Sequence, residues 1–246
     1  MKDKLYSDSR LAQFYDIDNG PGENTAYVTQ LADKAESVLD LGCGTGILLA
    51  SLGRKKYTVG VDPAVAMLDI ACRRSGGEVV KWVNGDARNI RLGQNFDLII
   101  LTGNVFQVFL SEADQRAVLT TIATHLSSQG MFVFDTRNPT REEWRTWTPK
   151  ASNRLIHHPS LGEVKAWNDV VYDAATHIAT YETHYLVLSD NTLFSASSRI
   201  MFTSFDTLKQ MMDDAGLVVV RWMGDWTGVE YTVSSPEIIP VGRLLV

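Results

Sequence analysis

The chain has 246 residues, 45% hydrophobic and 21% charged, and its 23 Lys and Arg against 29 Asp and Glu give a formal net charge of −6. This length can bury enough apolar surface to fold without disulfides or a structural metal, and the acidic balance disfavours a protein that wraps nucleic acid. Two cysteines are too few for a disulfide framework, no Cys or His set has metal-ligand spacing, and no apolar stretch reaches the ~18 residues of a membrane span. We therefore expect a soluble, cytoplasmic protein without a metal, a DNA partner or a membrane.

Short β-branched runs alternate with segments of helical period between residues 37 and 135. The predicted strands are 38–41, 57–61, 79–83, 96–101 and 131–135, and the predicted helices are 47–52, 64–73 and 111–126. Several strands are apolar almost without a break, as expected where helices cover both faces of a sheet. The alternation predicts a doubly wound parallel α/β sheet. Ser111 is the expected N-cap of the long helix, and Gly130 is expected to mark its end.

The pattern changes after residue 135. A short helix is predicted at 141–147, and 163–172, 177–188 and 193–202 are predicted strands of mixed alternation separated by turns. Strands without helices between them indicate an antiparallel lobe inserted after the fifth strand. A helix at 205–215, a strand at 217–222 and a last strand near 238–244 would then complete a seven-stranded sheet.

The first predicted strand carries Asp40 and runs into a loop with Gly42, Gly44 and Gly46. Glycines let the backbone approach a ligand closely and adopt positive φ. A dinucleotide fingerprint would need a small residue at position 47, which is Ile47. The Asp40 carboxylate would attract an ammonium group and repel a pyrophosphate. The loop therefore favours a ligand other than a dinucleotide, the alternative being a tight turn without a ligand.

Two more acidic residues follow the second and third predicted strands. Asp62, next to Pro63, can accept both hydroxyls of a ribose, and Asp86, next to Ala87, can accept an exocyclic adenine amine. The alternatives are a helix start at Asp62 and an Asx turn at Asp86. The carboxyl ends of parallel strands share one edge of the sheet, where open α/β folds bind ligands. Three landmarks in this order therefore indicate one binding site.

With these motifs the sequence resembles the class I S-adenosylmethionine-dependent methyltransferases, in detail over residues 14–135 and in outline over 213–222. The resemblance implies a Rossmann-like doubly wound sheet of seven strands, the last antiparallel, and S-adenosylmethionine as cofactor with S-adenosylhomocysteine as product. It implies that the methionine part lies at Asp40 and 42–46, the ribose at Asp62, the adenine at Asp86, and the sulfonium beside 102–104. The implied cofactor contacts are Tyr15, Asp40, Gly42, Cys43, Gly44, Gly46, Asp62, Pro63, Met67, Asp86, Ala87, Thr102, Gly103 and Asn104.

The resemblance also suggests four parts of the chain. They are an N-terminal helical lid segment (1–36), a cofactor-binding core (37–139), an inserted β lobe that shapes the acceptor pocket (140–204) and a part that completes the core sheet (205–246). Phe14-Tyr15-Asp16 resembles an N-terminal element that closes over the cofactor in several small-molecule enzymes. We expect residues 6–18 to be a mobile lid, because their aromatic side chains need a cover to pack on.

The expected acceptor is a small molecule methylated at nitrogen or oxygen by in-line displacement. Residues 101–107 lack the Asn/Asp-Pro-Pro-aromatic segment of adenine methyltransferases, and five of the six tryptophans follow the fifth strand, where they either cover an acceptor or form the core of the β lobe. The predicted substrate contacts are Phe106, Arg137, Trp144 and Trp147. The candidate bases, none of them preferred, are Tyr15, Asp135, Tyr181 and His184.

Several alternatives stay open on the sequence alone. The chain could bind S-adenosylmethionine without catalysis, because no residue near the expected acceptor is decisive. It could be an oxidoreductase on the same general fold, which Asp40 and Ile47 disfavour. It could also methylate RNA or protein. A monomer or a homodimer is expected.

Overall fold

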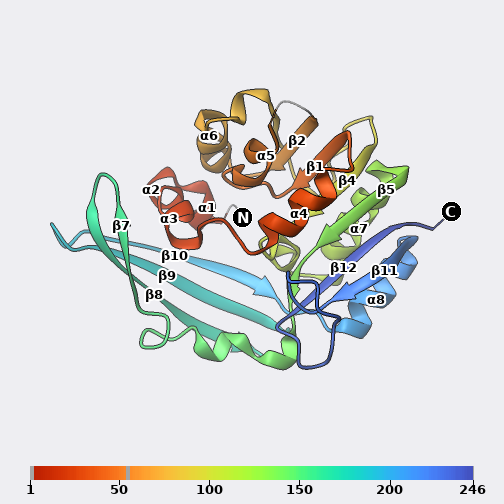
Figure 1. Ribbon diagram of the computed structural model, residues 1–246. Helices are drawn as coiled ribbons and strands as arrows, with labels where there is room; N and C mark the ends of the chain where they lie inside the picture. Colours follow the sequence, from red (N-terminus) through yellow and green to blue (C-terminus); the bar gives the residue numbers. More distant parts are fainter. Residues whose placement is uncertain (1–2, 54–55, 246) are drawn as a thin grey trace.

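The computed structural model describes residues 3–53 and 56–245 and contains two β-sheets (Figure 1). The larger has the strand order β11-β12-β5-β4-β1-β2-β3, with β6 paired to β12, and the smaller is antiparallel in the order β10-β9-β8-β7. The strands of the larger sheet are β1 (Ser37–Leu41), β2 (Tyr57–Asp62), β3 (Lys81–Asn84), β4 (Phe96–Leu101), β5 (Leu126–Phe134), β6 (Thr136–Arg137), β11 (Leu217–Met223) and β12 (Glu237–Leu244). Those of the smaller sheet are β7 (Arg154–His158), β8 (Gly162–Asp173), β9 (Ile178–Val187) and β10 (Leu193–Met201).

The larger sheet is parallel from β3 to β5, whereas β12 runs antiparallel to both of its neighbours, β5 and β11. The predicted fold class is therefore confirmed, including the antiparallel last strand and the β insertion after β5. In this register Asp40 lies opposite Gly60, and Asp62 lies opposite Asn84. The polar residues that follow the strands thus meet at one edge of the sheet.

Helices cover both faces of the larger sheet. They are α4 (Asn24–Ala32), α5 (Ile47–Leu52), α6 (Val65–Arg73), α7 (Glu112–His125) and α8 (Phe205–Asp214). Alternate residues of one strand enter different cores: Leu39 packs in a cluster with side chains of α7 and α8, whereas its neighbour Val38 packs with side chains of α4 and α5. Burial on both faces explains the continuous apolar runs of the central strands.

Three local predictions differ in outcome. The Ser111 hydroxyl accepts the N–H of Asp114 at 3.1 Å, so the predicted N-cap of α7 is confirmed. The expected end at Gly130 is wrong, because α7 ends at His125 and Gly130 lies within β5, where a Cβ would come to 2.7 Å from the carbonyl oxygen of Phe96. The predicted helix at 141–147 is instead two 3-10 turns, η4 (Pro139–Arg141) and η5 (Glu143–Thr146), separated by Glu142 at positive φ.

One strand of the smaller sheet was not predicted. β7 is an edge strand of five residues, three of which are Arg154, His157 and His158. Only two adjacent residues of β7 are apolar, so the strand shows little periodicity in the sequence. It pairs with β8, the strand that follows it in the chain. The remaining three strands of the smaller sheet match the predicted segments within a few residues.

The N-terminal helices α1 (Lys4–Ser7), α2 (Ser9–Ala12) and α3 (Tyr15–Asn19) lie between the smaller sheet and α6 (Figure 1). Phe14 is fully buried and stacks on Tyr185 of β9, with 4.4 Å between ring centroids. Asp18 forms an ion pair with Arg154 of β7 and accepts the Tyr185 hydroxyl at 2.9 Å. This segment therefore docks on the inserted β sheet.

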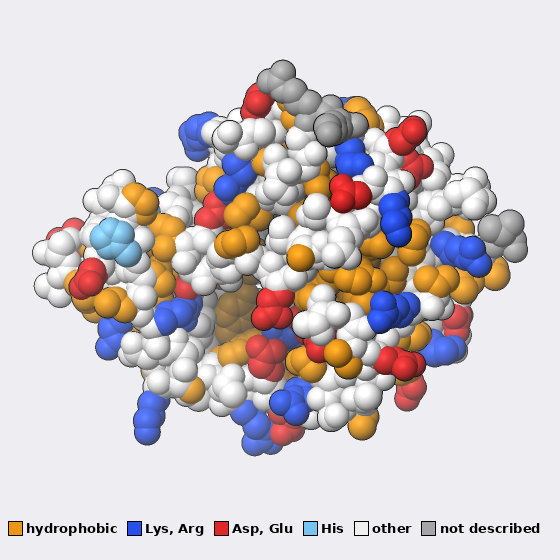
Figure 2. Space-filling view, viewed as in Figure 1, with side chains coloured by type: hydrophobic (Ala, Val, Ile, Leu, Met, Phe, Trp, Pro, Cys, Tyr) orange, Lys and Arg blue, Asp and Glu red, His pale blue; other side chains and the backbone are white. Residues whose placement is uncertain are grey.

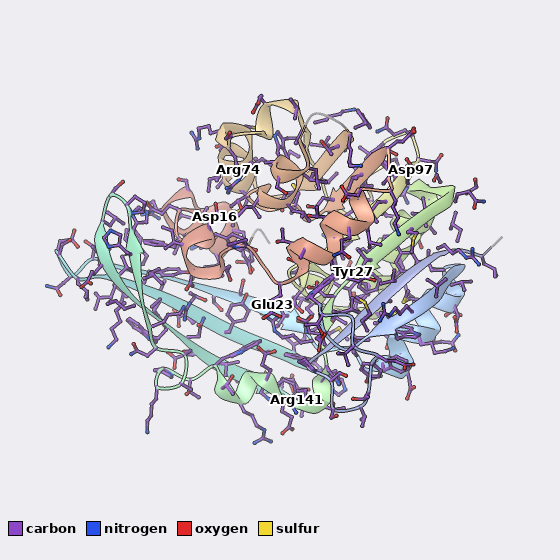
Figure 3. All side chains as sticks on the ribbon, viewed as in Figure 1. Asp16, Glu23, Tyr27, Arg74, Asp97 and Arg141 are labelled. Atoms are coloured by element: carbon purple, nitrogen blue, oxygen red, sulfur yellow. The ribbon has the colours of Figure 1, made fainter. Side chains whose placement is uncertain are left out.

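The same segment also contacts the core of the larger sheet. Asp16 forms an ion pair with Arg74 at the end of α6 (Figure 3) and accepts the Thr45 hydroxyl at 2.6 Å. Because Thr45 belongs to the glycine-rich loop, the N-terminal helices connect that loop to the β sheet. We propose that these helices are the mobile lid and that the chain divides into the four parts predicted above.

Replacing Asp18 by Asn tests this docking. The change leaves the partly buried guanidinium of Arg154 without its carboxylate and should cost about 1–2 kcal/mol of local stability, because Arg154 keeps some contact with water. Amide exchange over residues 15–19 should then be about tenfold faster, as measured by hydrogen–deuterium exchange mass spectrometry. Asp8→Asn is the control, because its pair with Arg10 is exposed and Asn caps a helix equally well. Equal exchange in both variants would contradict the docking role.

None of the helices in residues 3–53 and 56–245 has the length and apolar character needed to span a membrane. In the same residues, no three His, Cys, Asp or Glu side chains gather in a way that could hold a metal ion.

Candidate active site

Asp40 lies near the end of β1, only 4% exposed, beside the glycine-rich loop. No residue that the structure describes donates a hydrogen bond to its carboxyl group. Burial, and to a smaller extent the nearby charge of Asp62, raise the pKa of Asp40 to about 8. A buried carboxyl group without a partner is costly. Its position is therefore suited to a ligand that brings a positive charge.

The three glycines of the loop all have positive φ but differ in their surroundings. A Cβ at Gly42 would come to 2.5 Å from Val105, and one at Gly46 would overlap the ring of Trp82 and come to 2.8 Å from Ala71. At Gly44, no atom of the described chain lies within 4 Å of the position that a Cβ would take. Gly42 and Gly46 thus make room for the protein's own side chains, and only Gly44 faces open space.

Trp82 of β3 is a residue that the sequence reasoning missed. Its ring would also come to 2.5 Å from a Cβ at Gly60, which lies directly opposite it in the sheet. The sequence signal that could have indicated this contact was a tryptophan in the short strand that follows a strand containing glycine. Cys43, the residue between the first two glycines, lies against Gly60 as well, and burial raises the pKa of its thiol.

Asp62 ends β2 and holds the loop in place. Its carboxylate accepts the N–H of Gly44 at 2.9 Å and the N–H of Ala64 at 2.8 Å, just before α6. Burial raises the pKa of Asp62, while these two hydrogen bonds lower it in part. Asp62 thus bonds the backbone at the start of α6, as the helix-start alternative predicted. Its carboxylate oxygens have further lone pairs that can accept ribose hydroxyls. Met67 of α6 is buried against Ala12 and Tyr15.

Asp86 follows β3 and is engaged by Arg88. Its carboxylate accepts the backbone N–H of Arg88 at 2.9 Å, which is an Asx turn, and pairs with the guanidinium at 2.6 Å. The side chain of Arg88 lowers the pKa of Asp86. Ala87 is buried in the main core. The Asx alternative is therefore seen, and an adenine contact at Asp86 stays a prediction.

Asp135 lies directly after β5 and fixes the turn after β4. Its carboxylate accepts the backbone N–H of Asn104 at 2.8 Å and that of Gly103 at 3.2 Å, and Trp226 Nε1 donates to it at 3.3 Å. Asn104 adopts a φ of 61°, a left-handed conformation that is uncommon for a residue other than glycine. Asp135 thus positions the backbone that follows Thr102, where the sulfonium is expected.

Arg137 lies in β6, two residues after Asp135, and contacts Trp147. The guanidinium of Arg137 donates to Gln107 Oε1 at 3.0 Å, pairs with Glu143 at 3.0 Å and lies over the Trp147 ring, 5.2 Å from its centroid. The Trp147 ring meets Tyr181 of β9 edge-on. The space-filling view is hollowed between the N-terminal helices and the smaller sheet, with hydrophobic side chains in the floor and acidic ones at the rim (Figure 2).

Tyrosine side chains connect this region to the cofactor loop. The hydroxyl groups of Tyr6 and Tyr181 are 3.1 Å apart, and the rings of Tyr6 and Tyr15 meet edge to face. Burial raises the pKa of Tyr15 to about 12, and the charges of Asp62 and Asp135 contribute to the shift. Tyr15 thus packs against Tyr6 and the buried Met67 of α6.

Three further predicted residues pack against aromatic side chains. Phe106 is fully buried and stacks on Phe134 in the main core, and Trp144 is 7% exposed and stacks on Tyr172 in the core of the β lobe. His184 points to the face of β9 opposite Tyr181, where it bonds Ser195 and stacks on Trp167. Phe106 thus packs within the core of the larger sheet and His184 lies on the other face of β9, whereas Trp144 shares a cluster with Trp147 and Tyr181.

Comparisons with known proteins agree with this geometry. Residues 38–130 match a family model described as a methyltransferase domain. The chain is 29% identical to a dTDP-3-amino-3,6-dideoxy-alpha-D-glucopyranose N,N-dimethyltransferase of Streptomyces fradiae, covering 89% of this chain and 88% of the relative. It is 26% identical to a cypemycin N-terminal methyltransferase of a Streptomyces species, covering 83% and 82%. The solved structure of the CcbJ methyltransferase from Streptomyces caelestis superposes with a TM-score of 0.78 at 22% identity over the whole of both chains.

The residues also fit S-adenosylmethionine. The unpartnered Asp40 carboxyl suits the ammonium group of its methionine part, and the open side of Gly44 leaves space for a ligand next to it. The acidic Asp62 at the end of the neighbouring strand is in the position that binds ribose hydroxyls in nucleotide-binding α/β folds. The matched methyltransferase domain, the methyltransferase relatives along most of the chain and the sheet order make the protein similar to the class I S-adenosylmethionine-dependent methyltransferases.

Proposed function

We propose that the protein transfers a methyl group from S-adenosylmethionine to a nitrogen or oxygen atom of a small molecule bound between the two sheets. The observation that carries the proposal is the group formed by Arg137, Trp147 and Tyr181 beside Asp135, at the end of β5 where the cofactor's sulfonium is expected. Two aromatic walls with one cation and a few hydroxyl groups suit a small, partly polar acceptor. One relative is named as an N,N-dimethyltransferase of dTDP-3-amino-3,6-dideoxy-alpha-D-glucopyranose, and an amino sugar of this kind supports the small size class.

The proposed roles follow from the contacts. When bound, S-adenosylmethionine supplies an activated methyl group, so the protein has mainly to align the acceptor and exclude water. Asp40 would hold the ammonium group and Asp62 the ribose. Asp135 fixes the turn at Asn104 on the acceptor side, and the N-terminal helices, through Tyr15, cover the junction of the two ligands. A cytoplasmic location rests on the two free cysteines, and a monomer or homodimer is proposed from the sequence alone.

Methyl transfer can be tested without knowing the acceptor. Titration calorimetry should show S-adenosylmethionine binding, and incubation of the protein with methyl-labelled cofactor and a metabolite extract should place the label in the small-molecule fraction. Label in RNA or protein would contradict the proposed acceptor class. Binding without any transfer would favour the alternative of a cofactor-binding protein without catalysis.

A further inference from the structure

Glu237, at the start of β12, is a carboxyl group beside the proposed acceptor position that none of the roles above uses. It pairs across the sheet with Arg137 of β6, two residues after Asp135. The side chain of Asn104 lies close enough to stabilise its carboxylate, and Arg137 does so by charge. Glu237 therefore belongs to the same group of side chains as Asp135 and Asn104, at the ends of β4 and β5.

Two oxygen atoms of this group lack partners. Glu237 Oε2 and Asn104 Oδ1 are both buried from solvent and make no hydrogen bond within the described residues. Buried oxygens of this kind are normally bonded. A group that carries several N–H donors would satisfy both at once, whereas a hydroxyl has one hydrogen to offer.

The charges around Glu237 are mostly negative. The titratable groups that act on it are Asp135, Arg137 and Glu143, of which Arg137 is already paired with Glu143. Such surroundings attract an ammonium ion and repel a developing alkoxide.

Resting on the proposed methyl transfer, we infer that Glu237 binds the acceptor as an ammonium ion and takes its proton, so that the enzyme methylates nitrogen. Proton transfer from the ammonium to the Glu237 carboxylate leaves a neutral amine. The nitrogen lone pair then forms the bond to the methyl carbon, and the carbon–sulfur bond breaks with its electron pair left on sulfur. The proton held by Glu237 passes to solvent when the methylated ammonium product leaves.

The protonation equilibrium of Glu237 supports this role. Burial raises its pKa, the charge of Asp135 raises it further, and Arg137 lowers it in part. A base whose pKa is raised toward that of an amine can exchange a proton with it at little cost. An aliphatic hydroxyl is about as weak an acid as water, and the same base would leave it protonated.

Glu237→Gln keeps the shape of the side chain and removes the base. With wild-type enzyme, labelled cofactor should methylate the amine and not the alcohol in matched pairs such as 3-amino-3-deoxyglucose and glucose, or ethylamine and ethanol. For the best amine, kcat/KM of Glu237→Gln at neutral pH should fall about 100-fold. Its activity should then rise about tenfold per pH unit up to the pKa of the amine, because only the neutral amine reacts. A merely structural role would lower activity without changing the pH profile.

Glu163→Gln, an exposed position on β8, is the matched control and should keep wild-type rates. A carboxyl signal of Glu237, assigned by 13C NMR with the variant in the presence of S-adenosylhomocysteine, gives a readout that needs no turnover. It should titrate above the usual range of glutamate and shift to the ionised position with saturating ethylammonium but not ethanol. Titration in the usual range, no response to ethylammonium, transfer to the alcohols, or a Glu237→Gln enzyme with an unchanged profile would overturn the inference. Absence of cofactor binding would instead overturn the proposed function.

Discussion

Asp40→Asn should weaken S-adenosylmethionine binding by about 10–100-fold, as measured by titration calorimetry at neutral pH. Asp40 is 4% exposed and its carboxyl group receives no hydrogen bond from the described residues, so a bound ammonium group would be its main partner. A hydrogen bond between charged groups contributes about 1.5–3 kcal/mol. Asparagine keeps one acceptor oxygen and the volume of the side chain, so the loss measures the charge.

Binding at Asp40 should also release close to one proton at pH 7. Burial raises the pKa of Asp40 to about 8 in the folded chain, so the free protein holds a proton there. An ammonium partner stabilises the ionised carboxylate and expels that proton. The binding enthalpy should therefore change with the ionisation enthalpy of the buffer, and this dependence should be lost in Asp40→Asn.

The raised pKa of Asp40 should also make the stability of the ligand-free protein depend on pH. In the unfolded chain the carboxyl titrates at the ordinary value of 3.8, so between about pH 4 and 8 the folded state binds more protons than the unfolded state. The stabilising contribution of protonated Asp40 is thus complete below about pH 4 and is lost as the pH rises to 8. Thermal unfolding without ligand should show this decline, and Asp40→Asn should flatten it.

Asp33→Asn is the control for these measurements, because Asp33 is an exposed residue just before β1. Its affinity and its proton release should match the wild type. An Asp40→Asn protein that binds as tightly as the Asp33 control would mean that the methionine part of the cofactor is held elsewhere.

The sequence predicts best what depends on local periodicity. Runs such as 96–101 and the capped helix after Ser111 identify a strand and a helix because their apolar spacing and capping residue act within a few positions. Gly130 misleads for the same reason, since its need for glycine comes from the carbonyl of Phe96 in a neighbouring strand. A contact across the sheet leaves no trace in the local pattern.

In the candidate site, too, the sequence predicts residues marked by a local pattern and misses those that only the fold brings together. Asp40 and Asp62 could be predicted as cofactor contacts because each lies at the end of a strand next to a recognisable loop. Glu237 could not be found, because it lies about 100 residues after Asp135 and reaches the site only through the antiparallel return of β12. Phe106 and Trp144 were predicted as substrate contacts from their place in the sequence, and that place did not indicate that both side chains stack on aromatic rings in packed clusters.

Gly44→Ala and Gly46→Ala should fail in different ways although the two residues are neighbours in one loop. Both have positive φ, which costs an alanine about 1–2 kcal/mol. At Gly46 the new methyl group also meets Trp82 and Ala71, and such overpacking adds about 1–3 kcal/mol. Gly46→Ala should therefore lower Tm by about 10 °C, as seen by calorimetry, with a folded fraction that still binds S-adenosylmethionine weakly.

Gly44→Ala should lower the stability of the protein only by the cost of a positive φ for alanine. Its affinity for S-adenosylmethionine should fall at least tenfold, because the new methyl group enters the open space where the ligand is expected. The addition of S-adenosylmethionine should raise the Tm of wild type and leave that of Gly44→Ala nearly unchanged. Gly216→Ala, also at positive φ with open surroundings but at the end of α8, isolates the backbone cost and should keep the full ligand-induced shift. If Gly44→Ala bound the cofactor as Gly216→Ala does, the loop would be a structural turn and the ligand would approach from another side.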